Sequence, residues 1–153
     1  MTRLTIGITN CNRLLYTKAL IESLECVARR DDVQLIVVDN ASAEPGTEEA
    51  LGEIDYIDDL FLRKERDWLN DEYTAKNIII EKAKGESMLF LQDDCQMVID
   101  SDVFMTIVDD FSRMNDVKCI SLTAIRAVSV AGKFNPDSED IVGKSGIRYW
   151  SPP

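Results

Sequence analysis

The chain of 153 residues contains no histidine, which excludes catalysis by a Ser-His-Asp or Cys-His set within this chain. Its four cysteines are widely separated and include no Cys-x-x-Cys pair; they are Cys11, Cys26, Cys95 and Cys119. Without histidines or paired cysteines, a structural zinc site is not expected. Cys95 stands beside two carboxylates and can be read as a reactive thiol, but a small, partly buried residue is its more common role.

Long hydrophobic runs are also absent. No apolar run approaches the roughly 18 residues of a membrane-spanning helix, so no membrane span is expected in this chain. The N-terminal residues pass directly into a strand-like pattern without the apolar core of a signal peptide. We therefore expect a cytoplasmic chain, or the cytoplasmic part of a larger one. The length predicts one globular domain.

Basic residues are scarce, with 17 Lys and Arg against 28 Asp and Glu and a net charge of −11. A nucleic-acid surface is not expected, because phosphate binding needs clustered lysines and arginines. An acidic protein that binds an anionic ligand needs a metal ion, a helix N-terminus or a few well-placed bases. The excess of acid is equally compatible with plain solubility.

The apolar periodicity predicts alternating strands and helices. Strands are predicted at 3–9, 33–38, 87–91 and 119–124, with an edge or partly irregular strand at 54–62. Helices are predicted at about 13–29, 45–51, 70–84 and 102–114. This order is typical of an α/β fold with an open, mostly parallel sheet and helices on both faces.

Several boundaries carry specific signals. Asn12 and Ser101 are suited to cap the first and last helices, and Gly85 stands where a C′ glycine belongs. The apolar density of 87–91 predicts a strand buried on both faces. From Ala127 the pattern weakens: 127–134 can form a hairpin around Gly132, and 135–153 shows no clear element.

Polar side chains follow three of the predicted strands, at Thr9–Arg13, Asp39–Ser42 and Asp93–Asp94. Because the carboxyl ends of parallel strands meet at one edge of a sheet, these groups are expected to line a single cleft. Two adjacent carboxylates can hold a hard divalent cation, which can in turn hold phosphate oxygens. The alternative is a solvated loop with two acids.

Four motifs together resemble the N-terminal half of a GT-A fold glycosyltransferase, most closely the large inverting group called family 2. They are Thr9-x-x-x-Arg13, Val37–Ser42, Ala75-Lys76-Asn77 and Leu89–Asp94. The resemblance covers about residues 3–125. It implies a Rossmann-like three-layer fold, with a nucleotide-sugar (donor) binding domain at 1–125. Residues 126–153 then form a tail leading toward an acceptor half that is absent or truncated.

The resemblance also implies roles for individual residues. The residues that it assigns to the nucleotide sugar are Thr9, Asn10, Arg13, Asp39, Asn40, Lys76 and Asp93. Asp39 would accept a hydrogen bond from the base, Thr9 would pack beside the base, and Lys76 would reach toward the nucleotide. Asp94 matches the last acid of the Asp-x-Asp motif, which ligates Mg²⁺ or Mn²⁺, and Asp93 lies near the ribose and the metal. Gln92 replaces the first acid of the motif, which weakens the expected metal site.

Simpler interpretations of these residues stay open. Asp39 can be a turn acid, Lys76 a solvated surface charge, and Arg13 a salt-bridge partner that holds the first helix. The aromatic residues Trp68, Tyr149 and Trp150 can stack on sugar rings or pack in a core.

The implied function is transfer of a sugar from a nucleotide sugar, with UDP-sugar favoured, to an unknown acceptor hydroxyl, with inversion. The acceptor can be a carbohydrate, a lipid or a protein. No catalytic base is identified, because Asp137, Glu139 and Asp140 follow Asp94 too closely to match it. A truncated, non-catalytic nucleotide-sugar-binding or assembly module is the alternative. A receiver-like phosphoacceptor domain is disfavoured, because Thr9-Asn10 stands where that domain needs acids.

Overall fold

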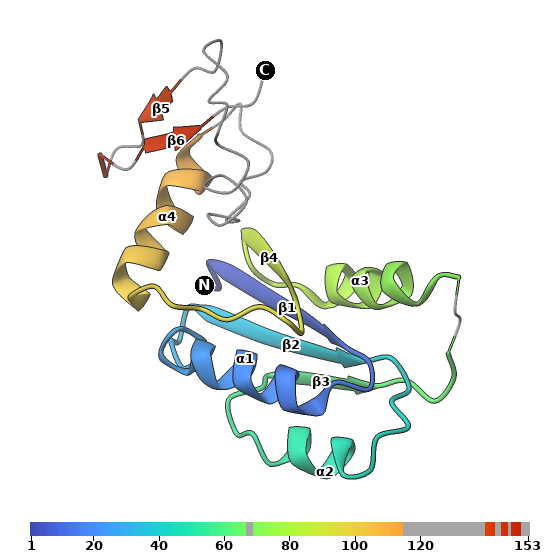
Figure 1. Cartoon of the computed structure of the whole chain (residues 1–153). Helices are drawn as coiled ribbons and strands as arrows, with labels where there is room; N and C mark the ends of the chain where they lie inside the picture. The colour runs from blue at the N-terminus through green and yellow to red at the C-terminus, as the bar shows by residue number, and fades with distance from the viewer. Residues whose placement is uncertain (67–68, 115–139, 143–144, 147, 151–153) are drawn as a thin grey trace, which may run out of the picture. The chain divides into compact units, whose positions relative to one another are not determined.

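The computed structural model describes residues 1–66, 69–114, 140–142, 145–146 and 148–150. The chain divides into two compact units, Met1–Ser101 and Asp102–Pro153. The first unit contains β1 (Leu4–Asn10), α1 (Leu14–Ala28), β2 (Val33–Asp39), α2 (Thr47–Gly52), β3 (Asp59–Leu62), α3 (Asp71–Lys82) and β4 (Ser87–Gln92), shown in Figure 1. Helix α4 (Ser101–Arg113) and the short strands β5 (Asp140–Val142) and β6 (Arg148–Trp150) follow.

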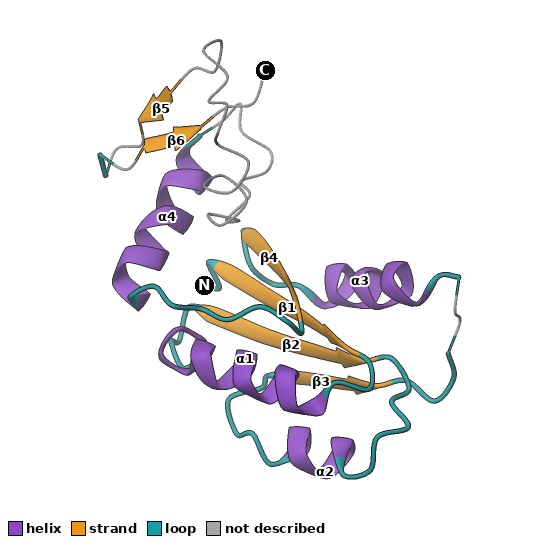
Figure 2. Cartoon of the chain, viewed as in Figure 1, coloured by secondary structure: helices purple, strands orange, loops and turns teal. Residues whose placement is uncertain are grey.

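The first unit is built on a four-stranded sheet in the order β3-β2-β1-β4, and all three neighbouring pairs are parallel. One face packs on α3, whose Ala75 and Ile79 form a buried cluster with Ile36 and Val38 of β2. The alternate residues of β2 are buried on the opposite face, along which α1 runs (Figure 2). The predicted open parallel sheet with helices on both faces is therefore confirmed.

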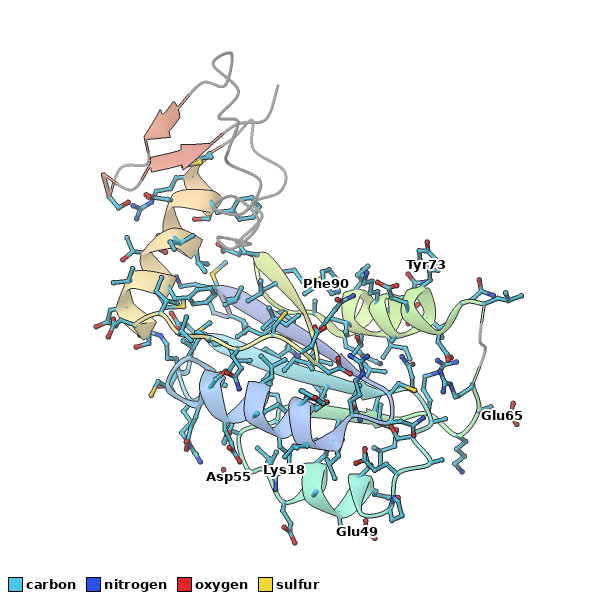
Figure 3. The ribbon with its side chains drawn as sticks, in the orientation of Figure 1. Lys18, Glu49, Asp55, Glu65, Tyr73 and Phe90 are labelled. Carbon is cyan, nitrogen blue, oxygen red and sulfur yellow. The ribbon has the colours of Figure 1, made fainter. Side chains whose placement is uncertain are left out.

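Strand β4 differs from its prediction. It was expected to be buried on both faces, but Phe90 is 39% exposed and most of its other residues are only half-buried (Figure 3). The reason is its position, since within the described residues β4 pairs with β1 alone and forms one edge of the sheet. The strand predicted at 54–62 narrows to Asp59–Leu62 and lies at the other edge, as expected.

The role predicted for Gly85 was wrong. Helix α3 ends at Lys82, and Ala83 already has an extended backbone, so Gly85 is not its C′ residue. A Cβ on Gly85 would lie 2.4 Å from the backbone nitrogen of Thr5 and 2.6 Å from the carbonyl carbon of Leu4. Glycine is required here because β1 approaches closely.

Two further predictions were wrong, one for the N-cap of the first helix and one for the C-terminal segment. Arg13 is the N-cap of α1, whereas Asn12 has a left-handed φ of 54° and lies outside the helix. The segment 135–153 was expected to have no clear element, but it contains the antiparallel pair β5 and β6. Three-residue strands are too short to produce a periodic signal, although β-branched and aromatic residues favour them.

Three sequence predictions concern residues outside the described ranges: the strand at 119–124, the hairpin at 127–134 and the aromatic residue Trp68. Among the helices that the structure describes, none combines the length and apolar character needed to cross a membrane.

Candidate functional site

The carboxyl ends of β1, β2 and β4 meet at one edge of the sheet. In the register of the sheet, Asn10 pairs with Asp39 and Thr9 pairs with Gln92. The loops that follow these strands begin with Cys11, Asn40 and Asp93. The sheet therefore brings the three predicted groups of polar residues to one edge, which is where α/β sheets bind ligands.

Asp39 is the centre of a buried network and is only 4% exposed. Its Oδ1 accepts hydrogen bonds from Asn10 Nδ2 at 2.6 Å and from Ser42 Oγ at 2.5 Å. Its Oδ2 accepts one from the backbone nitrogen of Ser42 at 2.9 Å. The amide oxygen of Asn10 in turn accepts a hydrogen bond from Thr17 Oγ1 on α1 at 2.8 Å. This network fixes the orientation of the Asp39 carboxylate before any ligand arrives.

The loops after β1 and β2 are joined to each other. The backbone nitrogen of Asn12 donates to Ser42 Oγ at 2.8 Å, and Asn12 Oδ1 accepts from the backbone nitrogen of Ala43 at 2.7 Å. Asn12 and Ala41 both have left-handed φ angles, of 54° and 53°. Ala41 carries strain in this conformation, because a Cβ crowds the backbone there.

The N-terminus of α1 is capped from the second loop. Its first backbone nitrogen, that of Leu14, donates to Glu44 Oε2 at 2.8 Å, whereas its N-cap residue makes no side-chain cap. A carboxylate at this end of a helix also interacts favourably with the positive end of the helix dipole. Glu44 therefore positions the start of α1 against the loop that follows β2.

Arg63 and Arg66 are site residues that sequence reasoning missed. Arg63 follows the last residue of β3, and its Nη1 donates to Asn40 Oδ1 at 2.7 Å and to Asp71 Oδ1 at 2.8 Å. Arg66 Nε donates to Asp71 Oδ2 at 3.0 Å. The sequence signal that could have identified Arg63 is its position directly after a strand. Because β3 pairs with β2, that position lies beside the end of β2. These bases supply positive charge at the edge of an acidic protein.

The acid pair after β4 is held by Arg13. Arg13 Nη1 lies 3.2 Å from Asp93 Oδ1 and 3.9 Å from Asp94 Oδ2. The side chain of Asp93 is 12% exposed, whereas those of Asp94 and Arg13 are 57% and 54% exposed. One guanidinium nitrogen thus forms ion pairs with both acids, so Arg13 makes a salt bridge in the structure, while its predicted contact with a ligand stays a prediction.

The acid pair offers carboxylate oxygens, the ligand type that divalent cations such as Mg²⁺ take in proteins. Across the described ranges, no group of three or more Cys, Asp or Glu side chains is arranged to hold a metal ion. Mg²⁺ is commonly held by only one or two carboxylates together with substrate phosphates. The guanidinium of Arg13 shows that a cationic group can sit against both carboxylates at once.

Two predicted residues are less closely tied to this edge. Thr9 is half-buried, and its backbone lies between Val38 and Gln92. Lys76 Nζ lies 2.5 Å from Glu72 Oε1, one turn earlier on α3, in a surface ion pair. Lys76 therefore has the partner expected of a solvated helix charge.

Cys11 lies in the electrostatic field of the site. Burial raises the pKa of its thiol, and the nearby carboxylates of Asp39, Asp71 and Asp93 raise it further, against the opposing effect of Arg66. The thiol Sγ donates to the backbone oxygen of Asn40 at 3.7 Å. Cys11 is therefore a protonated, packed group.

The sequence matches the family described as glycosyl transferase family 2 over residues 5–125. The chain therefore belongs to this family, and the predicted resemblance is confirmed. No curated protein sequence is significantly similar to the chain.

Solved structures share the fold at low identity. TarS from S. aureus, residues 1–349, is 18% identical with a TM-score of 0.55, over 71% of this chain and 33% of that fragment. The mannosyltransferase PcManGT from Pyrobaculum calidifontis, solved with GDP-Man and Mn²⁺, is 21% identical with a TM-score of 0.58, over 74% of this chain and 32% of that one. TarS 1–349 has also been solved with UDP-GlcNAc. The chain thus spans about a third of the length of these two solved chains and 20% of the longer TarS structure.

Proposed function

We propose that this chain binds a nucleoside-diphosphate sugar, with UDP-sugar favoured, at the carboxyl edge of its sheet. The observation that carries the proposal is the register of β1, β2 and β4, which brings Asn10, Asp39 and the acid pair to one edge in a family 2 member. The complexes of TarS with UDP-GlcNAc and of PcManGT with GDP-Man and Mn²⁺ support this ligand class.

Asp39 would recognise the nucleotide base. Its Oδ2 accepts one hydrogen bond, from Ser42, and a carboxylate oxygen has two lone pairs, so a base N–H can be the second donor. A buried, pre-oriented acceptor discriminates strongly, because a base without the matching donor leaves it unpaired. Asn10, Thr9 and Asn40 would then line the surroundings of the base.

Asp93 and Asp94 would hold Mg²⁺ or Mn²⁺ together with the diphosphate. When bound, the cation supplies Lewis-acid stabilisation of the charge on the departing nucleoside diphosphate. Arg13, Arg63 and Arg66 place positive charge at this edge of a chain whose net charge is −11. Lys76 can join them only by leaving Glu72, an exchange that costs little for a surface pair.

The reaction in this proposal is sugar transfer to an acceptor hydroxyl with inversion, which requires a base on the opposite face of the sugar. The proposal assigns neither that base nor an acceptor-binding half to this chain, which covers 33% and 32% of the similar chains. Donor binding without turnover is the second candidate, favoured by the same coverage. The division at residue 125 and the cytoplasmic location stay predictions.

The test is calorimetric titration of UDP and then GDP into the full chain, with and without Mn²⁺. We expect metal-dependent binding of one nucleotide that weakens by about tenfold or more in Asp94→Asn. Glu49→Gln, a change of an exposed acid on α2, is the matched control and should bind as the wild type does (Figure 3). Absence of nucleotide binding with Mn²⁺ present would refute the proposal. A turnover assay with a sugar derivative of the nucleotide that binds then distinguishes sugar transfer from donor binding without turnover.

A further inference from the structure

Arg13 is placed where a metal ion would compete with it. It is the N-cap of α1, and its Nη1 contacts Asp93 Oδ1 at 3.2 Å and lies 3.9 Å from Asp94 Oδ2. These are the carboxylates assigned to the cation. A guanidinium and a divalent cation cannot share these oxygens at full strength, because two positive charges about 4 Å apart repel each other even in water.

We infer that Arg13 is a built-in counter-cation that exchanges partners: it pairs with Asp93 and Asp94 in the free protein and turns to the diphosphate when metal and nucleotide bind. This inference rests on the proposed function. Its consequence is that the free protein binds the metal weakly, whereas nucleotide and metal bind cooperatively, each raising the affinity for the other by the same factor.

The exposure of these groups makes the exchange inexpensive. Arg13 and Asp94 are both more than half exposed, and ion pairs of this kind contribute little to stability. Only the side chain of Asp93 is largely shielded from solvent. Arginine is also suited to the second partner, since its planar donors match phosphate oxygens in pairs.

The acid content of the loop supports the same role. Gln92 precedes the pair, so the strand end offers two carboxylates, and Arg13 neutralises part of their charge. A metal site with this composition is completed by ligand oxygens rather than by further protein acids. Arg13 would thereby prevent the site from filling with metal before the nucleotide arrives.

The inference is tested by Mn²⁺ binding to the full chain without nucleotide, measured from the free Mn²⁺ signal in electron paramagnetic resonance. We expect Arg13→Gln to bind Mn²⁺ about tenfold more tightly than the wild type, and Arg13→Lys, which keeps the charge, to stay close to it. The gain should vanish in the double variant Arg13→Gln with Asp94→Asn. Lys18→Gln, which removes one positive charge elsewhere on α1, is the control for net charge (Figure 3).

The second measurement is UDP affinity at saturating Mn²⁺, which should fall by about threefold to tenfold in Arg13→Gln. A merely structural arginine would weaken both affinities, whereas partner exchange moves them in opposite directions. Equal Mn²⁺ affinity in Arg13→Gln and wild type overturns the inference, as does an unchanged UDP affinity in a wild type that binds UDP. If the wild type binds no nucleotide, the proposed function fails, and an Mn²⁺ affinity that does not rise in Arg13→Gln still refutes the competition by Arg13. A thermal melt of each variant checks that it folds.

Discussion

Asn10 Nδ2 donates a hydrogen bond to Asp39 Oδ1 at 2.6 Å, between two residues that are also register partners at the ends of β1 and β2. The same amide accepts from Thr17 on α1. The buried side chain of Asn10 on β1 therefore connects α1, through Thr17, with β2, through Asp39, whose carboxylate is proposed to recognise the base. Satisfied networks of this kind rigidify a site, because each unpaired partner would be costly in the interior.

The first prediction concerns Asp39→Asn. The amide keeps the shape of the carboxylate, but its nitrogen would face either Asn10 and Ser42 Oγ or the backbone nitrogen of Ser42, all of which donate. At least one buried donor then loses its acceptor, which costs about 1–3 kcal/mol. We expect the free energy of unfolding in urea to fall by this amount.

Asp31→Asn is the matched control, because Asp31 is exposed and lies just before β2. It should change the free energy of unfolding by about 0.5 kcal/mol or less. If Asp39→Asn is as stable as this control, the network does not hold Asp39 in the manner described.

The second prediction concerns the cap supplied by Glu44. Glu44→Ala removes the acceptor of the Leu14 backbone nitrogen at the start of α1 and should cost about 1 kcal/mol. Glu44→Gln keeps an oxygen acceptor but loses the charge that favours the helix dipole, so its loss should be smaller. Urea denaturation of both variants provides the measurement. Equal losses in the two variants would contradict a capping hydrogen bond.

Parts of this site could be predicted from sequence because their signals are local. Strand ends are marked by apolar runs that stop at polar residues, and this pattern alone predicts Asp39, Asp93 and Asp94 at one edge of the sheet. The parallel order of the sheet followed from the alternation of strands and helices. The family match supports the resemblance drawn from the same motifs.

The missed contacts depend on tertiary pairing. Arg63 reaches Asn40 only because β3 lies beside β2, and Glu44 caps α1 from a loop that follows a different strand. Gly85 was misread for the same reason, since a glycine after a helix suggests a left-handed cap, whereas here the close approach of Thr5 requires it. Burial of β4 could not be judged from composition, because the number of neighbouring strands decides it.

The third prediction tests that reading of Gly85. In Gly85→Ala the new Cβ would meet backbone atoms of Leu4 and Thr5, which cannot rotate away, so we expect a loss of about 3 kcal/mol or more. Gly52→Ala is the control: a Cβ there meets no atom within 4 Å at the end of α2. That variant should be unchanged or up to about 1 kcal/mol more stable. Similar melting temperatures for the two variants would refute the close-approach explanation.

The last prediction concerns pH and Asp32, which precedes β2 and joins it to β1. Burial alone would raise the pKa of Asp32, but hydrogen bonds from Arg3 at 2.8 Å and Arg30 at 3.2 Å outweigh burial and leave the pKa below its ordinary value. A depressed carboxyl pKa stabilises the folded state above the unfolded pKa of about 3.9, and this stabilisation is lost as the pH falls through the folded value.

Asp32→Asn should therefore destabilise the protein by about 1 kcal/mol or less at pH 7, since the pair is partly exposed. The difference from wild type should shrink as the pH falls below about 4. The wild-type carboxyl is then protonated first in the unfolded state and at lower pH in the folded state, so its charge no longer favours folding. Urea denaturation of both proteins at a series of pH values measures the effect. A difference that stays constant between pH 7 and pH 3 would mean that Asp32 acts through its shape and not through its charge, since only the charge titrates in this range.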